Sequence, residues 1–339
     1  MMKPAILILS QYPDEHASLI TKRLESLNAQ HVWFDPGDFP AQEEITLEYD
    51  RSGLVRSVLH HHQYDVDLST IRVVWERRPS KPQASPLVKE ASLREWIQNE
   101  SRIFLAGLWD SLDCSWVPGK PSDVRTANEK VYQLALAAQL GFRIPRTRFS
   151  NRPQDFTETY DTFDGRLVSK VIGNHIVKSK GEDFFGFTHA VRRRDAANYS
   201  SIRHAPSLFQ EYVPKASELR ITVVGSQVFA AEIHSQATRP TRDDWRHFDL
   251  DRIPYVRHAL PAHIETLCVN LVRALRLCFG AIDMILTPNG EYVFLEINPN
   301  GLWTWVESKT GLPIADAIAS LLAGKAAAAR KGELSGIVI

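Results

Sequence analysis

The stretch from Gly280 to Glu307, GAIDMILTPNGEYVFLEINPNGLWTWVE, constrains the fold of this chain more than any other. Two runs rich in β-branched and aromatic residues, Ala281–Thr287 and Glu291–Ile297, flank Pro288-Asn289-Gly290. Asn-Gly between two such runs is the strongest short-range signal for a β-hairpin. We therefore predict a hairpin whose two-residue loop is Asn289-Gly290.

That loop places three oxygen-bearing side chains on one face of the hairpin. It sets Asp283 directly opposite Glu296, and Asn298 alternates back onto the same face. Facing carboxylates repel each other unless one is protonated or a cation lies between them. Oxygen-only ligands favour a hard cation, Mg²⁺ or Mn²⁺, over zinc. The alternative is a solvated face whose acids pair with basic neighbours, but the continuation into Asn298-Pro299-Asn300-Gly301 favours a metal site of Asp283, Glu296 and Asn298.

Composition limits the class of protein. The chain has 339 residues, 44% of them hydrophobic, which is enough for two or three domains. Lys plus Arg and Asp plus Glu number 40 each, so no overall charge attracts nucleic acid or an anionic membrane. The three cysteines, Cys114, Cys268 and Cys278, have no CxxC spacing, which is typical of a reduced cytoplasmic protein. The apolar run Ala5–Leu9 is too short for a signal peptide or a membrane span.

The order of patterns along the chain predicts an α/β protein. A strand at Ala5–Leu9, a helix to about Asn28 and a strand at His31–Phe34 make a βαβ opening without GxGxxG. One helix is expected from Ser122 to Gly141, and another over Ala262–Phe279. The expected units are residues 1–120, 121–205 and 206–325, followed by a tail at 326–339.

Several short motifs follow one another in a characteristic order. They are Asn128-Glu129-Lys130, Val168-Ser169-Lys170, Gln210-Glu211-Tyr212-Val213, Glu218-Leu219-Arg220, and Asp283 with Glu296-Ile297-Asn298-Pro299. In this order they resemble the RimK-like branch of the ATP-grasp superfamily, from about Ser122 to Ala323. Further strings make the chain most similar to the microviridin-type enzymes, which cross-link ribosomally made precursor peptides. These strings are Val74-Trp75-Glu76-Arg77-Arg78-Pro79, Asp244-Trp245-Arg246, and the run from Asn298 to Glu307.

The resemblance implies a fold and a set of roles. The fold would be an α/β (α+β) ATP-grasp fold with an N-terminal βαβ pre-ATP-grasp domain that recognises a peptide leader. Lys130 and Lys170 would hold the phosphates of ATP, residues 210–213 would grip adenine, and Glu218 would bind the ribose. Arg220 and Arg246 would neutralise charge on the transferred phosphoryl group, beside Mg²⁺ on the predicted acidic site. The implied nucleotide-binding residues are Lys130, Lys170, Gln210, Glu211, Tyr212, Val213 and Glu218.

The implied activity is activation of a carboxylate through an acyl phosphate, followed by ester or amide formation between side chains of a precursor peptide. A RimK-like ligase that joins a free amino acid or amine to a carboxylate is the alternative. A nucleotide-binding scaffold without turnover would be expected to lack a metal ligand, and all three are present. Arg77, Arg78 and the Arg-rich loop 239–246 favour an acidic peptide partner, and a homodimer is common in similar enzymes.

The segment Gly173–Gly181 departs from the family pattern because it is sparse in glycine. It is not a Walker A loop either, since Lys178 stands where the second glycine is needed. We expect a mobile lid, in which the roles of Lys178 and Lys180 stay open.

Overall fold

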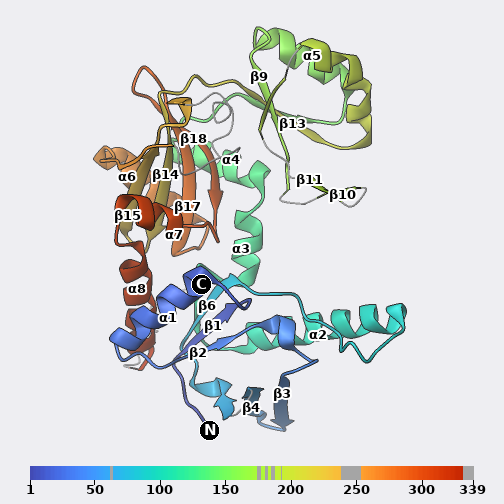
Figure 1. The fold of residues 1–339 in the computed structure, drawn as a ribbon, viewed down its shortest axis with the longest axis vertical. Coiled ribbons are helices and arrows are strands. Elements are labelled where there is room, and N and C mark those ends of the chain that lie inside the picture. The colour runs from blue at the N-terminus through green and yellow to red at the C-terminus, as the bar shows by residue number, and fades with distance from the viewer. Residues whose placement is uncertain are drawn as a thin grey trace.

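The computed structural model describes residues 1–61, 64–173, 177–179, 182–184, 188–191, 193–237 and 253–330 (Figure 1). These residues form a mixed α/β structure, as predicted. In Figure 1 an N-terminal region lies at the bottom, a sheet built from C-terminal strands lies above it, and a smaller sheet with α5 lies at the top. None of the described helices is long and apolar enough to cross a membrane.

The N-terminal region contains the predicted βαβ unit. Strand β1 (Ile6–Ser10) is followed by helix α1 (Glu15–Ser26) and the parallel strand β2 (His31–Phe34). The sheet has the order β2-β1-β6-β7, completed by β6 (Val73–Arg78) and β7 (Ser115–Val117). The order reverses between β1 and β6, which makes the carboxyl ends of these two strands a topological switch point.

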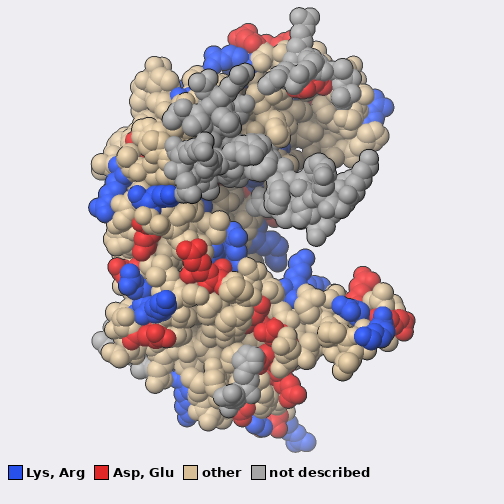
Figure 2. All heavy atoms as spheres, viewed as in Figure 1, with Lys and Arg blue, Asp and Glu red and all other residues tan. Residues whose placement is uncertain are grey.

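An antiparallel sheet and one long helix are inserted into this region. The sheet consists of β3 (Glu44–Asp50), β4 (Gly53–His61) and β5 (Tyr64–Asp67). Helix α2 (Ala91–Ser111) is continuous and projects from the body of the molecule (Figures 1 and 2). Basic and acidic side chains are interspersed on the face shown in Figure 2, in keeping with the equal numbers of the two charges.

The helix predicted from Ser122 to Gly141 is wrong as a single element. The structure breaks it into α3 (Pro121–Ala127) and α4 (Lys130–Leu140). Glu129 takes an extended conformation between them, and the amide of Asn128 turns back to donate to Val124 O at 2.9 Å. The break places Lys130 at the start of α4, while the predicted end at Gly141 is confirmed by its φ of 96°.

The central sheet is antiparallel and has the order β12-β9-β13-β8. Helix α5 (Pro153–Thr162) covers it, with Phe156 5.5 Å from Phe209 between ring centroids. The strands are β8 (Thr147–Ser150), β9 (Leu167–Lys170), β12 (His189–Val191) and β13 (Ser207–Glu211). A short hairpin of β10 (Val177–Ser179) and β11 (Glu182–Phe184) and a 3₁₀ segment, Arg193–His204, belong to the same region.

The C-terminal sheet has the order β16-β15-β14-β17-β18. Helix α6 (Ala262–Ala274) covers one face and ends earlier than predicted, because Arg276 adopts a left-handed φ of 57°. Cys278 therefore lies outside the helix, and Gly280 belongs to a strand. The strands are β14 (Ser217–Val224), β15 (Gln227–Ile233), β16 (Tyr255–Arg257), β17 (Phe279–Leu286) and β18 (Tyr292–Asn298).

The last helices attach this sheet to the N-terminal region. Helix α7 (Thr304–Thr310) was not predicted, and α8 (Ile314–Arg330) continues into residues 326–330 of the predicted tail. Helix α8 packs against α1, and Trp303 lies with both in one buried core. The loop after β18 is therefore held between the N-terminal sheet and the C-terminal sheet.

Candidate active site

The predicted hairpin is present, and Asp283 lies directly opposite Glu296. The predicted two-residue loop is wrong. Thr287 N donates to Glu291 O at 2.9 Å and Gly290 N donates to Thr287 O at 2.9 Å, so the loop is Pro288-Asn289-Gly290. Gly290 has a φ of 80°, which suits the left-handed position of such a loop.

A β-bulge offsets the longer loop. The register shifts between Asp283 and Met284, so that Met284 pairs with Phe294 and Leu295 is the extra residue. Phe294 therefore enters the core beside Met284, where the predicted register would have placed Leu295. Beyond the bulge the strands return to the predicted pairing, which brings the two acids together.

A row of charged side chains crosses three strands of the C-terminal sheet. Arg220 on β14 pairs with Asp283 on β17, which pairs with Glu296 on β18. Nη1 of Arg220 donates to both carboxylate oxygens of Asp283, at 2.8 and 3.0 Å. The Arg220 side chain is 7% exposed and that of Asp283 is 16% exposed. The amide of Asn298 donates to the same carboxylate at 3.2 Å, so the predicted metal ligands Asp283 and Asn298 are in contact.

Lys130 closes the other end of the row. Its Nζ lies 3.3 Å from Glu296 Oε2 and donates to Val171 O at 2.8 Å. Val171 directly follows Lys170, the last residue of β9, so the structure brings both predicted phosphate-binding lysines to one end of that strand. The start of α4, the end of β9 and the base of the hairpin thus meet beside the acidic pair.

The loop after β18 is shaped to fit Arg220. Nη2 of Arg220 donates to Leu302 O at 3.1 Å. A Cβ atom at Gly301 would lie 2.6 Å from Arg220 Nη2 and 2.4 Å from the Cβ of Ala281. Only glycine leaves room for the guanidinium there, which gives the Asn300-Gly301 pair a packing role that the sequence did not reveal.

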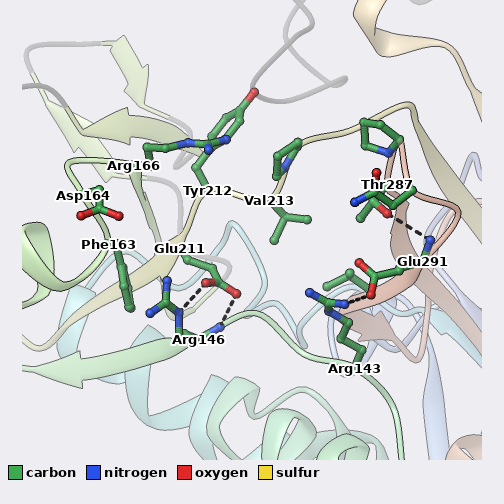
Figure 3. Close-up of a pocket in the computed structure, with 14 residues that line it drawn as sticks. Arg143, Arg146, Phe163, Asp164, Arg166, Glu211, Tyr212, Val213, Thr287 and Glu291 are labelled. Carbon is green, nitrogen blue, oxygen red and sulfur yellow. Dashed lines mark hydrogen bonds and ion pairs between the residues drawn. The ribbon is translucent and has the colours of Figure 1, made fainter.

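The predicted adenine hinge, Gln210–Val213, joins the central sheet to the C-terminal sheet. The Gln210 amide is buried and donates to Thr147 Oγ1 at 3.0 Å. The Glu211 carboxylate accepts from Arg146 N at 3.1 Å and from Arg146 Nε at 2.5 Å (Figure 3). These side chains therefore brace the hinge, and an adenine contact by Gln210 or Glu211 would have to use the backbone.

A cavity of about 420 Å³ lies between the hinge and the tip of the hairpin (Figure 3). Tyr212 and Val213 line it on one side, and Thr287 and Glu291 on the other. The guanidinium of Arg146 lies 4.5 Å above the Phe163 ring, and Arg143 forms an ion pair with Glu291. Arg143 and Arg146 were not predicted as site residues, although arginines recur in the run Arg143-Ile144-Pro145-Arg146-Thr147-Arg148.

The remaining predicted site residues divide into two groups. Glu218 lies two residues before Arg220 on β14, hence on the same face, and forms an ion pair with the buried Lys215 at 3.0 Å. Lys215 was not predicted. Arg246 and Lys180 lie outside the described residues, as does the whole of the Arg-rich loop 239–246.

Both acids pair with basic neighbours, Asp283 with Arg220 and Glu296 with Lys130, as the alternative to a metal site expected. The same oxygen atoms would also suit a hard divalent cation. Two carboxylates and an amide oxygen are the donors that Mg²⁺ accepts, and the bulge holds them on one face. Among the described residues no group of three or more His, Cys, Asp or Glu side chains could hold a metal, so nothing there resembles a zinc centre. With Lys130 and Arg220 on either side, the row could bind a polyphosphate together with its metal.

Two family models match the chain. The MvdD pre-ATP grasp domain matches residues 5–124, and the RimK-like ATP-grasp domain matches residues 127–322. These matches confirm the predicted fold. A curated relative, the probable alpha-L-glutamate ligase of Serratia proteamaculans, is 28% identical over 198 residues, which are 57% of this chain and 62% of that protein. The match thus spans less than two thirds of the relative's length.

Solved structures match nearly the whole chain. The macrocyclase MdnC of Microcystis aeruginosa MRC, bound with precursor peptide MdnA, is 32% identical with a TM-score of 0.84, and covers 94% of this chain and 99% of its own. A RiPP-associated ATP-grasp ligase of Chryseobacterium gregarium, in complex with ADP and a leader and core peptide, is 28% identical with a TM-score of 0.88, covering 95% and 97%. With its lysines, hinge and acidic row in the order of that family, this chain belongs to the RimK-like ATP-grasp family.

Proposed function

We propose that this protein is an ATP-dependent ligase that activates a side-chain carboxylate of a ribosomally made precursor peptide and closes ester or amide links within that peptide. The observation that carries the proposal is the row Arg220, Asp283, Glu296, closed by Lys130. In this row the two carboxylates would bind a metal ion, and the two cationic side chains on either side of them would bind phosphate. The likeness to peptide macrocyclases over nearly the full chain supports the choice of substrate.

The reaction takes two steps. A carboxylate oxygen of the peptide attacks the γ-phosphorus of ATP, ADP leaves, and an acyl phosphate forms. A hydroxyl or amine of the peptide then attacks the acyl carbon, its proton is lost, and inorganic phosphate leaves. The first step is needed because the oxygen of a carboxylate is a poor leaving group, whereas phosphate is a good one.

The chain's own residues supply position and charge. Lys130 and Lys170 would hold the phosphates, and Arg220 would meet the charge that develops on the transferred group. Arg220 is suited to this role because Asp283 and Leu302 O fix its orientation. Asp283, Glu296 and Asn298 would hold Mg²⁺, which when bound neutralises the β- and γ-phosphates. Arg246 is proposed as a second cation.

The nucleoside would lie at the hinge. The hinge backbone would read the adenine edge, with Tyr212 and Val213 packed nearby; the N–H groups of Glu211 and Tyr212 already donate to Arg146 O at 3.0 Å and Arg166 O at 2.8 Å, which leaves Val213 N as the hinge donor. Glu218 would accept from the ribose hydroxyls. The substrate peptide would carry acidic residues. The protein would act as a homodimer. Its three free cysteines and its need for ATP are consistent with a location in the cytoplasm.

The direct experiment incubates the purified protein with Mg-ATP and the peptide encoded by a short neighbouring reading frame rich in Thr, Ser or Lys and in Asp or Glu. The peptide mass should fall by one water for each ADP released. A mass increase equal to an amino acid would instead select the free amino acid ligase. ATP hydrolysis without any mass change would contradict both ligase functions.

A further inference from the structure

A second buried arginine, Arg77, lies at the carboxyl end of β6. It is 2% exposed, and its Nη1 donates to Asn300 O at 3.0 Å. Within the described part of the chain, its Nε and Nη2 are buried without a hydrogen-bond partner. Buried charges in proteins are normally paired, so two unpartnered donors on one guanidinium need an explanation.

The local backbone directs Arg77 to this place. In the parallel ladder Leu9 pairs with Glu76 and Ser10 pairs with Arg78, so Arg77 is the unpaired residue of a β-bulge. Bulges of this kind re-aim a side chain beside functional sites. The bulge lies at the ends of β1 and β6, where the strand order reverses, and open α/β sheets bind ligands at such a switch point.

Two more buried polar groups adjoin the bulge. Ser10 is 0% exposed and His16, in the first turn of α1, is 4% exposed. Among the described residues neither Ser10 Oγ nor His16 Nδ1 has a hydrogen-bond partner. Nε2 of His16 lies 3.4 Å from Thr304 Oγ1, and its ring stands edge-on to Trp303 with the ring centroids 4.8 Å apart.

Charge favours an anion at this point. Burial, with the neighbouring Arg77 and Arg78, lowers the pKa of His16 to about 3, so its imidazole is neutral at pH 7 and can donate from one nitrogen. Burial and Arg78 lower the pKa of Arg77 to about 10, while Asp14 acts in the opposite direction. The carboxylate of Asp14 also caps α1, where it accepts from Ala17 N at 2.7 Å, so one negative charge stands beside the two positive charges of Arg77 and Arg78.

We propose that Arg77, His16 and Ser10 form a subsite for a carboxylate of the substrate peptide. The unpartnered Nε and Nη2 atoms lie on one edge of the guanidinium, and that edge matches the two oxygens of a carboxylate. The neutral imidazole and the hydroxyl add donors without adding a competing negative charge. The identity of the ligand as a peptide side chain rests on the proposed function.

The subsite is connected to the acidic row through a single loop. Arg77 holds Asn300 O and Arg220 holds Leu302 O, so the two arginines grip neighbouring carbonyls of the segment after β18. Asn298, at the end of β18, begins the same segment. A peptide carboxylate bound at Arg77 would therefore anchor the substrate beside the phosphoryl-transfer site.

The test measures binding by the full-length protein without nucleotide. The probe is N-acetyl-L-glutamic acid N-methylamide, and its neutral counterpart is N-acetyl-L-glutamine N-methylamide. The ring signals of ¹³C-labelled histidine, with His16 assigned from His16→Gln, should shift saturably with the acid and not with the amide. Arg77→Gln should weaken binding of the acid by on the order of 10-fold or more, because it removes a charged hydrogen-bond donor.

The matched control is Arg78→Gln, which removes the same charge from the exposed neighbour and should change the affinity by less than about threefold. Ser10→Ala is too small a change to endanger folding and should weaken binding of the acid by about threefold. Thermal unfolding checks that every variant is folded. Three results would overturn the subsite. The acid and the amide could bind equally well, Arg77→Gln could bind the acid as tightly as the wild type does, or Arg78→Gln could weaken binding as much as Arg77→Gln does.

The binding test is independent of ligation. If the acid binds through Arg77 but no peptide is ligated, the proposed function fails and the carboxylate subsite stands. If peptides are ligated but the affinity for the acid does not depend on Arg77, the proposed function stands and the subsite is wrong.

Discussion

Two buried arginines hold the same loop from opposite sides, and they differ in their partners. Arg220, in the C-terminal sheet, has the carboxylate of Asp283 within 2.8 Å as well as the carbonyl of Leu302. Arg77, in the N-terminal sheet, has the carbonyl of Asn300, and two of its other nitrogens lack a partner in the described structure. Arg220 Nε also lacks a partner among the described residues, so the difference lies in the counter-charge: the first guanidinium is hydrogen-bonded to a carboxylate, and the second is hydrogen-bonded only to a carbonyl.

This difference is the one expected if Arg220 contributes to the fold and the reaction and Arg77 binds a ligand. Removing one member of a buried ion pair leaves the other charge without compensation, which is costly. Removing a buried charge that has no counter-ion relieves a desolvation penalty. Replacing each arginine by the same apolar side chain should therefore cost much less stability at a position that serves ligand binding than at one that serves the fold.

The largest contrast is expected in stability. Arg220→Met leaves Asp283 buried without its partner and should lower the free energy of unfolding by about 3–5 kcal/mol. Arg77→Met loses one hydrogen bond to a carbonyl and removes a desolvated charge, so the change should be less than about 1 kcal/mol in either direction. Urea denaturation of the two variants measures both values. Equal losses would contradict the distinction between the arginines.

The acidic row can also be broken at its carboxylates. Asp283→Asn and Glu296→Gln should each lower turnover by about 10²–10³-fold, because each weakens electrostatic stabilisation of the transferred phosphoryl group. ADP release in the presence of precursor peptide measures the rate. Glu158→Gln, an exposed carboxylate paired with Arg148, is the matched control and should leave the rate unchanged. Full activity in Glu296→Gln would remove the metal site from the account.

The loop between the arginines offers a sharper steric test. Gly301→Ala should destabilise the protein by about 1–3 kcal/mol, because the new Cβ would overlap Ala281 and Arg220 Nη2. Gly324→Ala is the control: it lies in α8 with nothing within 4 Å of the added Cβ, and should stabilise by about 0.5–1 kcal/mol. Thermal or urea unfolding compares the pair, and a neutral Gly301→Ala would mean that the loop does not constrain Arg220.

The N-terminal side of the comparison depends on pH through His16. Its pKa falls from 6.5 to about 3 in the folded protein, first because of burial and then because of Arg77 and Arg78. The unfolded chain binds a proton below pH 6.5 and the folded chain does not, so stability is present above pH 6.5 and is lost as the pH falls toward 3.

Between pH 7 and pH 5 this loss should be about 2 kcal/mol. His16→Gln, which cannot titrate, should lose correspondingly less over the same interval. Urea denaturation at the two pH values gives the comparison. Parallel pH dependence in wild type and variant would show that His16 is not shielded from protonation.

The sequence predicted the acidic pair correctly, although the register behind it was only partly right. A loop one residue longer than predicted and a bulge at Leu295 offset each other, and local patterns reveal neither. The break at Asn128-Glu129 was hidden because the apolar stripe continues across it. The end of α6 was misplaced because Arg276, not a glycine, takes the left-handed conformation.

The two arginines show the same limit at the level of the site. Arg220 could be assigned from its motif, and the structure gives it the partners of a fixed cation. Arg77 could be recognised as basic and suited to an acidic peptide, but its burial could not be foreseen. That burial depends on a bulge in β6, on the first turn of α1 and on a loop more than 200 residues away, which only the tertiary structure brings together.

The central claim is that a carboxylate oxygen of the peptide attacks the γ-phosphorus of ATP bound beside Arg220, Asp283 and Glu296. The most direct measurement uses a precursor peptide whose carboxylates carry oxygen-18, incubated with Mg-ATP in ordinary water. Because the activated oxygen leaves with phosphate when the new bond forms, the released inorganic phosphate should contain one labelled oxygen for each link closed. Unlabelled phosphate alongside linked peptide would contradict activation of the carboxylate at this site.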